Sequence, residues 1–74
     1  MKSDETWSNG PGVSYPEHTH PYHKTLTCQE GSITFTVRGR QVLLQKGDIL
    51  DLPPNTRHSA LVGPEGVTCS EIHS

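Results

Sequence analysis

Apolar and polar residues alternate along much of the chain, and this alternation predicts strands. The clearest case is residues 32–37, S-I-T-F-T-V, in which β-branched and aromatic residues occupy every second position. A repeat of two places each set on one face of a strand. No stretch carries a helical repeat of useful length, so the sequence predicts an all-β protein. Further short strands are expected over 13–20, 25–29, 41–45, 49–52, 58–62 and 67–72.

Turn-forming residues separate these segments. The predicted turns lie at Glu30-Gly31, at Gly39, and at 46–48, 53–55 and 63–66. Many short strands at regular spacing imply a sandwich or a barrel, and a barrel is favoured because closure removes exposed strand edges. Residues 1–12 are polar and end in N-G-P-G, which predicts a loose N-terminal arm. We therefore expect an arm over 1–12, with Trp7 at a subunit interface, and one barrel domain over 13–74.

The chain is short and offers little material for a core. It has 74 residues, of which 30% are hydrophobic and 5% are aromatic. Chains of this size usually need a metal, disulfides or a partner subunit for stability. A homodimer is therefore expected. The predicted core residues are Ile33, Phe35, Val37, Leu44, Leu50 and Leu52.

Charge and hydropathy exclude several classes of partner. The formal net charge is −2, and the Lys and Arg residues are scattered rather than gathered into a basic run. Such a sequence predicts no nucleic-acid binding. No apolar run is long enough to span a bilayer, so no membrane association is expected. Residues 1–12 lack the apolar segment of a signal peptide, which favours a cytoplasmic location.

The two cysteines, Cys28 and Cys69, have two interpretations. They are either small buried strand residues, or, in the case of Cys28, a residue near a metal site. A disulfide is disfavoured because no secretory signal points to an oxidising compartment.

The strongest chemical feature of the sequence is a set of histidines. His18 and His20 are separated by one residue, and on a strand such residues share a face. Two adjacent imidazoles form a chelating pair for Fe, Mn, Ni, Cu or Zn. His58 follows the rigid Pro53-Pro54-Asn55 turn and is the candidate third ligand. The ordinary alternative for a lone His-x-His pair is a pair of surface histidines.

The surrounding residues resemble the two short motifs of the cupin family. In the first motif, a glycine is followed after five residues by His-x-His and later by a glutamate and a second glycine. Here Gly12, His18-Thr19-His20 and Gly31 keep that spacing. In the second motif, a glycine precedes Pro-x-Gly and a histidine, which corresponds here to Gly47, Pro53-Pro54-Asn55 and His58. This resemblance, over residues 12–62, implies a jelly-roll-like double-stranded β-helix that holds a divalent transition metal.

The sequence departs from the family pattern at three positions. Asn55 replaces a glycine, which a turn tolerates because Asn adopts left-handed backbone angles, and Val62 replaces a loosely held Asn. Lys24 occupies the position of the family's metal-binding Glu, and an ammonium group cannot ligate. His23 is a candidate fourth ligand if a bulge rotates it inward. Otherwise the site has three histidines plus water, and Lys24 points outward or reaches an acidic partner or an anionic substrate.

Three functions follow from the resemblance. The first is a metal-dependent enzyme acting on a small molecule, such as a dioxygenase, isomerase or lyase. The second is a non-catalytic module that binds or senses a small ligand through the metal. The third is an oligomer in which the metal is structural. His73, at the C-terminus, is expected to be frayed rather than functional.

Overall fold

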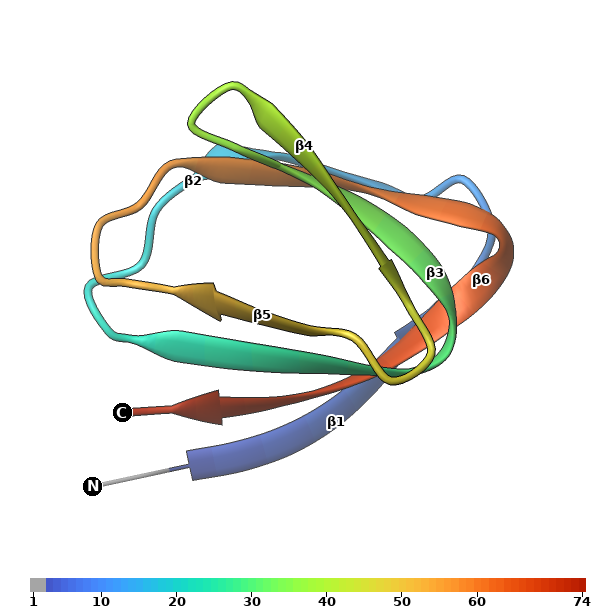
Figure 1. Ribbon diagram of the computed structural model, residues 1–74, viewed down its shortest axis with the longest axis horizontal. Helices are drawn as coiled ribbons and strands as arrows, with labels where there is room; N and C mark the ends of the chain where they lie inside the picture. Colours follow the sequence, from blue (N-terminus) through green and yellow to red (C-terminus); the bar gives the residue numbers. More distant parts are fainter. Residues whose placement is uncertain (1–2) are drawn as a thin grey trace.

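The computed structural model describes residues 3–74, and this part of the chain is all-β with no helix. Over the same residues, no helix is long and apolar enough to cross a lipid bilayer. The strands are antiparallel and belong to one sheet that folds back on itself (Figure 1). They are β1 (Ser3–Asn9), β2 (Ser14–His18), β3 (Lys24–Val37), β4 (Arg40–Gln45), β5 (Ile49–Leu52) and β6 (His58–His73).

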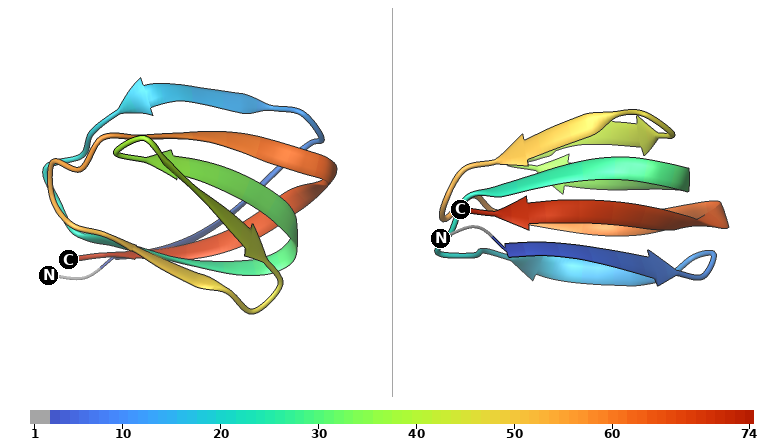
Figure 2. Two further views of the ribbon diagram at one scale, coloured as in Figure 1. Left: turned by 45° about the horizontal axis from the view of Figure 1, so that its top comes forward. Right: turned by 90° about the horizontal axis from the view of Figure 1, so that it is seen from below.

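Two long strands, β3 and β6, run through both layers of the folded sheet. The second half of β3 pairs with β4 and with the first half of β6, which in turn pairs with β2. The first half of β3 pairs with β5 and with the second half of β6, which in turn pairs with β1. Figure 2 shows the two layers joined where β3 and β6 bend. At the opposite end, loops connect β2 to β3 and β5 to β6. The candidate site described below lies at this end.

The bends occur at glycines, which permit a close approach of the two long strands. A side chain on Gly31 would overlap the carbonyl oxygen of Gly66, and Gly31 has a φ of +74°. The register of β3 against β6 shifts here, so residues 63–66 lie between consecutive pairs. The sequence predicts turns at 30–31 and 63–66 that divide the strands, but the structure has continuous, bent strands. Glycine allows the bend without ending the hydrogen-bonded ladder.

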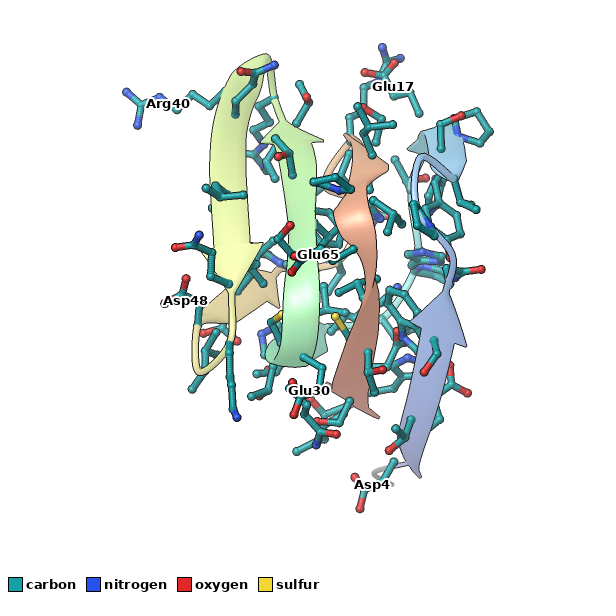
Figure 3. All side chains as sticks on the ribbon, turned by 90° about the vertical axis from the view of Figure 1, so that its right-hand side faces the viewer. Asp4, Glu17, Glu30, Arg40, Asp48 and Glu65 are labelled. Atoms are coloured by element: carbon teal, nitrogen blue, oxygen red, sulfur yellow. The ribbon has the colours of Figure 1, made fainter. Side chains whose placement is uncertain are left out.

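Apolar side chains fill most of the space between the layers, and most charged ones point outward. Of the predicted core residues, Val37 and Leu50 are only partly buried and pack against the core. Charged residues such as Glu30, Arg40 and Asp48 project away from the sheet (Figure 3). The buried core comprises Leu26, Cys28, Ile33, Phe35, Leu44, Leu52, Ala60, Val62, Val67 and Cys69.

The cysteines are two small buried core residues. Cys28 and Cys69 lie directly opposite each other on β3 and β6, and both are free thiols. Burial raises the pKa of Cys69 to about 12. Burial also raises the pKa of Cys28, so both thiols are protonated at neutral pH, and neither lines the pocket described below.

Residues 3–9 differ from the expected loose arm. They form β1, which pairs with β6 in an unbroken register from Ser3 opposite His73 to Asn9 opposite Val67. Polar residues can form this strand because its stability comes from the backbone ladder along β6. Trp7 consequently faces the interior, where its ring meets Tyr15 edge-on at 6.1 Å. Trp7 thus lines a pocket within the chain, whereas the sequence favoured a position at a subunit interface.

Candidate metal centre

Three imidazoles meet at the loop-bearing end of the barrel. His18 ends β2 and lies directly opposite His58, which begins β6. His20 follows two residues after His18, just beyond the end of β2. The ring centroids are 4.3 Å apart for His18 and His58, 4.7 Å for His18 and His20, and 5.2 Å for His20 and His58. One nitrogen from each ring lies within 4.8 Å of the other two.

The ring orientations are set by hydrogen bonds on the far side of each imidazole. Nδ1 of His18 lies 2.6 Å from the carbonyl oxygen of Pro16, and Nδ1 of His58 lies 2.8 Å from that of Thr56. A carbonyl only accepts, so both Nδ1 atoms carry the proton and both Nε2 atoms present a lone pair. His20 stacks on Tyr22, whose hydroxyl lies 3.3 Å from His20 Nδ1.

The donor set fits a divalent transition metal. Within residues 3–74, the buried Nε2 atoms of His20 and His58 have no hydrogen-bond partner. A buried polar atom without a partner is costly, and a metal ion would satisfy both nitrogens at once. Burial lowers the pKa of both His20 and His58, and the positive charge of Lys24 lowers them further. The two rings are therefore neutral at pH 7, the form in which imidazole binds a metal.

The loop before His58 has the conformation that the sequence predicts. Asn55 has a φ of 63°, the left-handed conformation expected for the Asn that stands in place of glycine. Its backbone N–H donates to the carbonyl oxygen of His20 over 2.7 Å. This bond joins the loop before β6 to the loop after β2. The loop thereby fixes His58 relative to His20.

The fourth candidate, His23, is not brought to the other three. Its Nε2 lies 3.2 Å from Oδ1 of Asp51, and its backbone exchanges hydrogen bonds with Ser74. No bulge occurs at the start of β3, so regular alternation places Lys24 with Leu26 on the inner face and His23 on the outer face. The structure therefore brings three histidines together and places Lys24, rather than His23, on the inner face beside them.

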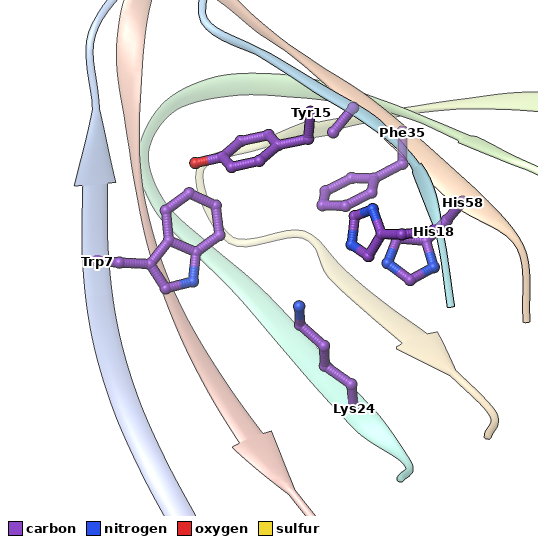
Figure 4. A pocket seen from close by; sticks show the side chains of 7 residues that line it. Trp7, Tyr15, His18, Lys24, Phe35 and His58 are labelled. Carbon is purple, nitrogen blue, oxygen red and sulfur yellow. The ribbon is translucent and has the colours of Figure 1, made fainter. Parts of the chain in front are cut away.

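A small cavity lies beside the histidines and is shown in Figure 4. Its volume is about 70 Å³. Aromatic rings and one ammonium group form most of its walls, and Figure 4 shows the Lys24 side chain reaching in from the strand opposite His18 and His58. The lining residues are Trp7, Tyr15, His18, Lys24, Phe35, His58 and Ala60.

A buried carboxylate, Glu71, supports this wall and was not anticipated from the sequence. It is 4% exposed and accepts hydrogen bonds from the Trp7 indole and the His73 ring. Its Oε2 atom is 3.5 Å from Nζ of Lys24. Burial alone would raise the pKa of Glu71, but His73, Lys24 and Trp7 outweigh this effect, so the pKa is lowered and the group is ionised.

His73 is ordered in β6 rather than frayed, because its ring packs on Tyr22 at 4.4 Å and bonds to Glu71. Glu5, Glu71 and His73 also bring potential ligand atoms within 4.8 Å of one another. Both oxygens of Glu71 already accept hydrogen bonds, however, so we assign no ion to this cluster. The only sequence signal for the network is that Glu71, like Lys24, falls on an inward-facing strand position.

The sequence of this chain resembles those of known proteins over most of its length. Residues 6–68 match the sequence profile of the cupin domain. Over 54 residues, 70% of this chain, the sequence is 43% identical to quercetin 2,3-dioxygenase of Bacillus subtilis, but the matched part is only 16% of that protein. The chain therefore spans about a sixth of the length of this curated relative.

Solved structures share the fold over nearly the whole chain. An RmlC-like cupin from Shewanella frigidimarina has a TM-score of 0.89 and 23% identity, covering 99% of this chain and 65% of that one. A cupin-like protein from Thermotoga maritima has a TM-score of 0.88 and 25% identity, covering 99% and 56%. The cupin domain of Schizosaccharomyces pombe Cnp3 has a TM-score of 0.91 and 17% identity, covering 99% and 55%.

Proposed function

Because the chain belongs to the cupin family, we propose that it binds one divalent transition metal through the Nε2 atoms of His18, His20 and His58. The observation that carries this proposal is the pair of buried, partnerless Nε2 atoms on His20 and His58, beside a third ring in the same cluster. Neutral imidazole suits iron, nickel, copper and zinc, and manganese is also a candidate. His23 is not included because it pairs with Asp51.

We further propose that the metal centre is catalytic and oxygenase-like. Three protein ligands leave coordination positions open, which is typical of catalytic rather than structural sites. When bound, the metal would supply Lewis-acid or redox chemistry. The 43% identity with a dioxygenase over 54 residues supports an oxygenase, although that relative is a much longer protein.

The residues of this chain have separate parts in such a site. The carbonyl groups of Pro16 and Thr56 hold two imidazoles with Nε2 toward the centre. The rings of Trp7, Tyr15 and Phe35 form a wall that limits the access of water. Lys24 brings a positive charge into the same cavity.

A second candidate function is a binding or sensing module without catalysis. Pockets for small-molecule ligands commonly have volumes of about 300–1,000 Å³, whereas this cavity measures about 70 Å³. No Asp or Glu is among its lining residues, so within the described part of the chain it lacks a carboxylate that could act as a general base.

Metal analysis of protein purified without an affinity tag tests metal binding. We expect about one transition ion per chain after the protein is equilibrated with iron, manganese, nickel, copper or zinc and then desalted. His18→Ala, His20→Ala and His58→Ala should each weaken binding by more than the roughly 100-fold that loss of an outer-shell partner costs. His23→Ala is the matched control and should bind as the wild type does. Wild-type protein that holds none of these ions would contradict the proposal.

Oxygen uptake distinguishes the two candidate functions. Each metal-loaded form is mixed with small oxidisable molecules, with quercetin included, in an oxygen electrode. Uptake that disappears in His18→Ala supports an enzyme. Ligand-induced spectral change without uptake supports a binding module.

A further inference from the structure

Among residues 3–74, Lys24 is the only lysine, arginine or acidic side chain that lines the metal-site cavity. Its side chain is 13% exposed, and Figure 4 shows its nitrogen directed into the space between Trp7 and the two histidines. A largely buried ammonium group is stabilised by partners for its three N–H donors. The identity of its partners therefore determines what the cavity binds.

Glu71 does not fully satisfy this ammonium group. The distance from Lys24 Nζ to Glu71 Oε2 is 3.5 Å, and that oxygen also accepts a hydrogen bond from His73. The other oxygen of Glu71 accepts the bond from Trp7. Among the described residues, no other acidic side chain pairs with Lys24. At least one N–H of Lys24 thus remains directed into the cavity.

The charge of the loaded site would favour an anion. Three neutral imidazoles add no charge to a dication, and Lys24 and Glu71 together cancel. The cavity would then carry about two positive charges in a poorly hydrated setting with aromatic walls, where electrostatic attraction is stronger than in water. Water or an uncharged ligand would leave this charge unbalanced, whereas a carboxylate would offset part of it.

The size and lining of the cavity restrict the anion further. Its volume of about 70 Å³ is several times the roughly 10–15 Å³ that a single water molecule needs. A carboxylate group fits this space, with the remainder of a larger molecule directed outward. Trp7, Tyr15 and Phe35 offer apolar contact to the carbon atoms next to that carboxylate.

We propose that this cavity is a carboxylate-binding subsite, in which one oxygen of a small organic carboxylate faces the metal position and the other accepts a hydrogen bond from Nζ of Lys24. The inference rests on the proposed metal site and adds to it the chemical class of the ligand. Lys24 is in this account a ligand-binding residue, and Glu71 is a positioning residue that holds the ammonium group in place.

Cobalt-loaded protein provides the test, because the visible spectrum of bound Co²⁺ changes when an anion enters its coordination sphere. Acetate is titrated into the wild type, with acetamide as the uncharged probe of the same shape. We expect acetate to change the spectrum saturably and acetamide to have little effect. Lys24→Met keeps a long apolar side chain without the charge and should weaken acetate binding at least about tenfold. Lys24→Arg should retain part of the affinity.

Two further variants isolate the role of the charge. Lys24→Met leaves the buried Glu71 carboxylate without its lysine partner, so the double variant Lys24→Met with Glu71→Gln removes that charge as well and should also bind acetate weakly. Lys46→Met removes an exposed lysine that pairs with Glu30 at 3.6 Å, and it should bind acetate normally. Equal acetate affinity in the wild type and Lys24→Met, with Co²⁺ bound by both, contradicts the subsite alone. Failure of the wild type to bind Co²⁺ contradicts the proposed metal site and the subsite together.

Discussion

At the scale of single residues, two of the candidate ligands are oriented by the same local contact. In both His18 and His58, the ring Nδ1 donates to the carbonyl oxygen two residues earlier in the chain. The clustering of His18, His20 and His58 could be predicted because each of the two motifs is local in sequence. The Glu71 network could not, because its contacts join residues as far as 64 positions apart and depend on the register of three strands.

Glu71 should make stability depend on pH. Its pKa is lower in the folded protein than in the unfolded chain. The ionised carboxylate therefore stabilises the fold above its ordinary pKa, and this stabilisation is lost as the pH falls through the lower, folded value. The lowered pKa values of His20 and His58 also make metal-free protein less stable as the pH falls. Below about pH 6.5, the unfolded chain binds protons at these histidines more readily than the folded protein does.

Glu71→Gln should lower the free energy of unfolding at pH 7 by roughly 1–3 kcal/mol, because it leaves Lys24 without its charged partner. The variant should also lose less stability than the wild type between pH 7 and pH 3. Chemical denaturation of metal-free protein at several pH values measures both effects. Glu30→Gln, an exposed glutamate paired with Lys46, is the control and should change little. Parallel pH profiles for Glu71→Gln and the wild type would show that Glu71 is not the group responsible.

At the scale of elements, the barrel depends on two strands that bend without ending. Alternation in the sequence predicted most of the strand segments, and the glycines predicted where the chain changes direction. These patterns could not predict that 25–29 and 32–37 form one strand, because a bend within a strand and a turn between strands use the same residue types. Strand β1 was missed for another reason. Its sequence is polar, and only pairing with β6 makes it a strand.

Gly31→Ala should destabilise the protein more than Gly12→Ala. Both glycines have nearly equal positive φ values, +74° and +75°, so the backbone strain of alanine is similar. A methyl group at Gly31 would overlap the Gly66 carbonyl oxygen, whereas one at Gly12 would meet nothing within 4 Å. We expect Gly12→Ala to cost about 1–2 kcal/mol and Gly31→Ala clearly more, as measured by thermal unfolding. Equal losses would mean that the bend does not require this close contact.

At the scale of the whole molecule, the all-β fold and the family followed from patterning and motif spacing. The outer face of the layer formed by β2, β6, β3 and β4 exposes two large apolar residues. Leu43 is 55% exposed and Leu61 is 53% exposed, on the two strands that flank Thr34. With so few hydrophobic residues in the chain, we propose that this face packs against a second copy in a homodimer.

Sedimentation at micromolar concentration should give twice the mass of the chain. Leu43→Ser with Leu61→Ser should shift the protein toward monomer, because these residues would be buried in the interface. Ile49→Ser is the control, since Ile49 is 64% exposed but lies on β5 in the other layer. A wild type that sediments as a compact monomer would remove the dimer from this account.

The central claim is the position of the metal, and anomalous diffraction from crystals of the metal-loaded protein measures it most directly. The account predicts one strong anomalous peak at about 2.0–2.1 Å from Nε2 of His18, His20 and His58 if zinc is used. A peak beside Glu71 and His73, or no peak among the three imidazoles at full metal loading, would contradict it.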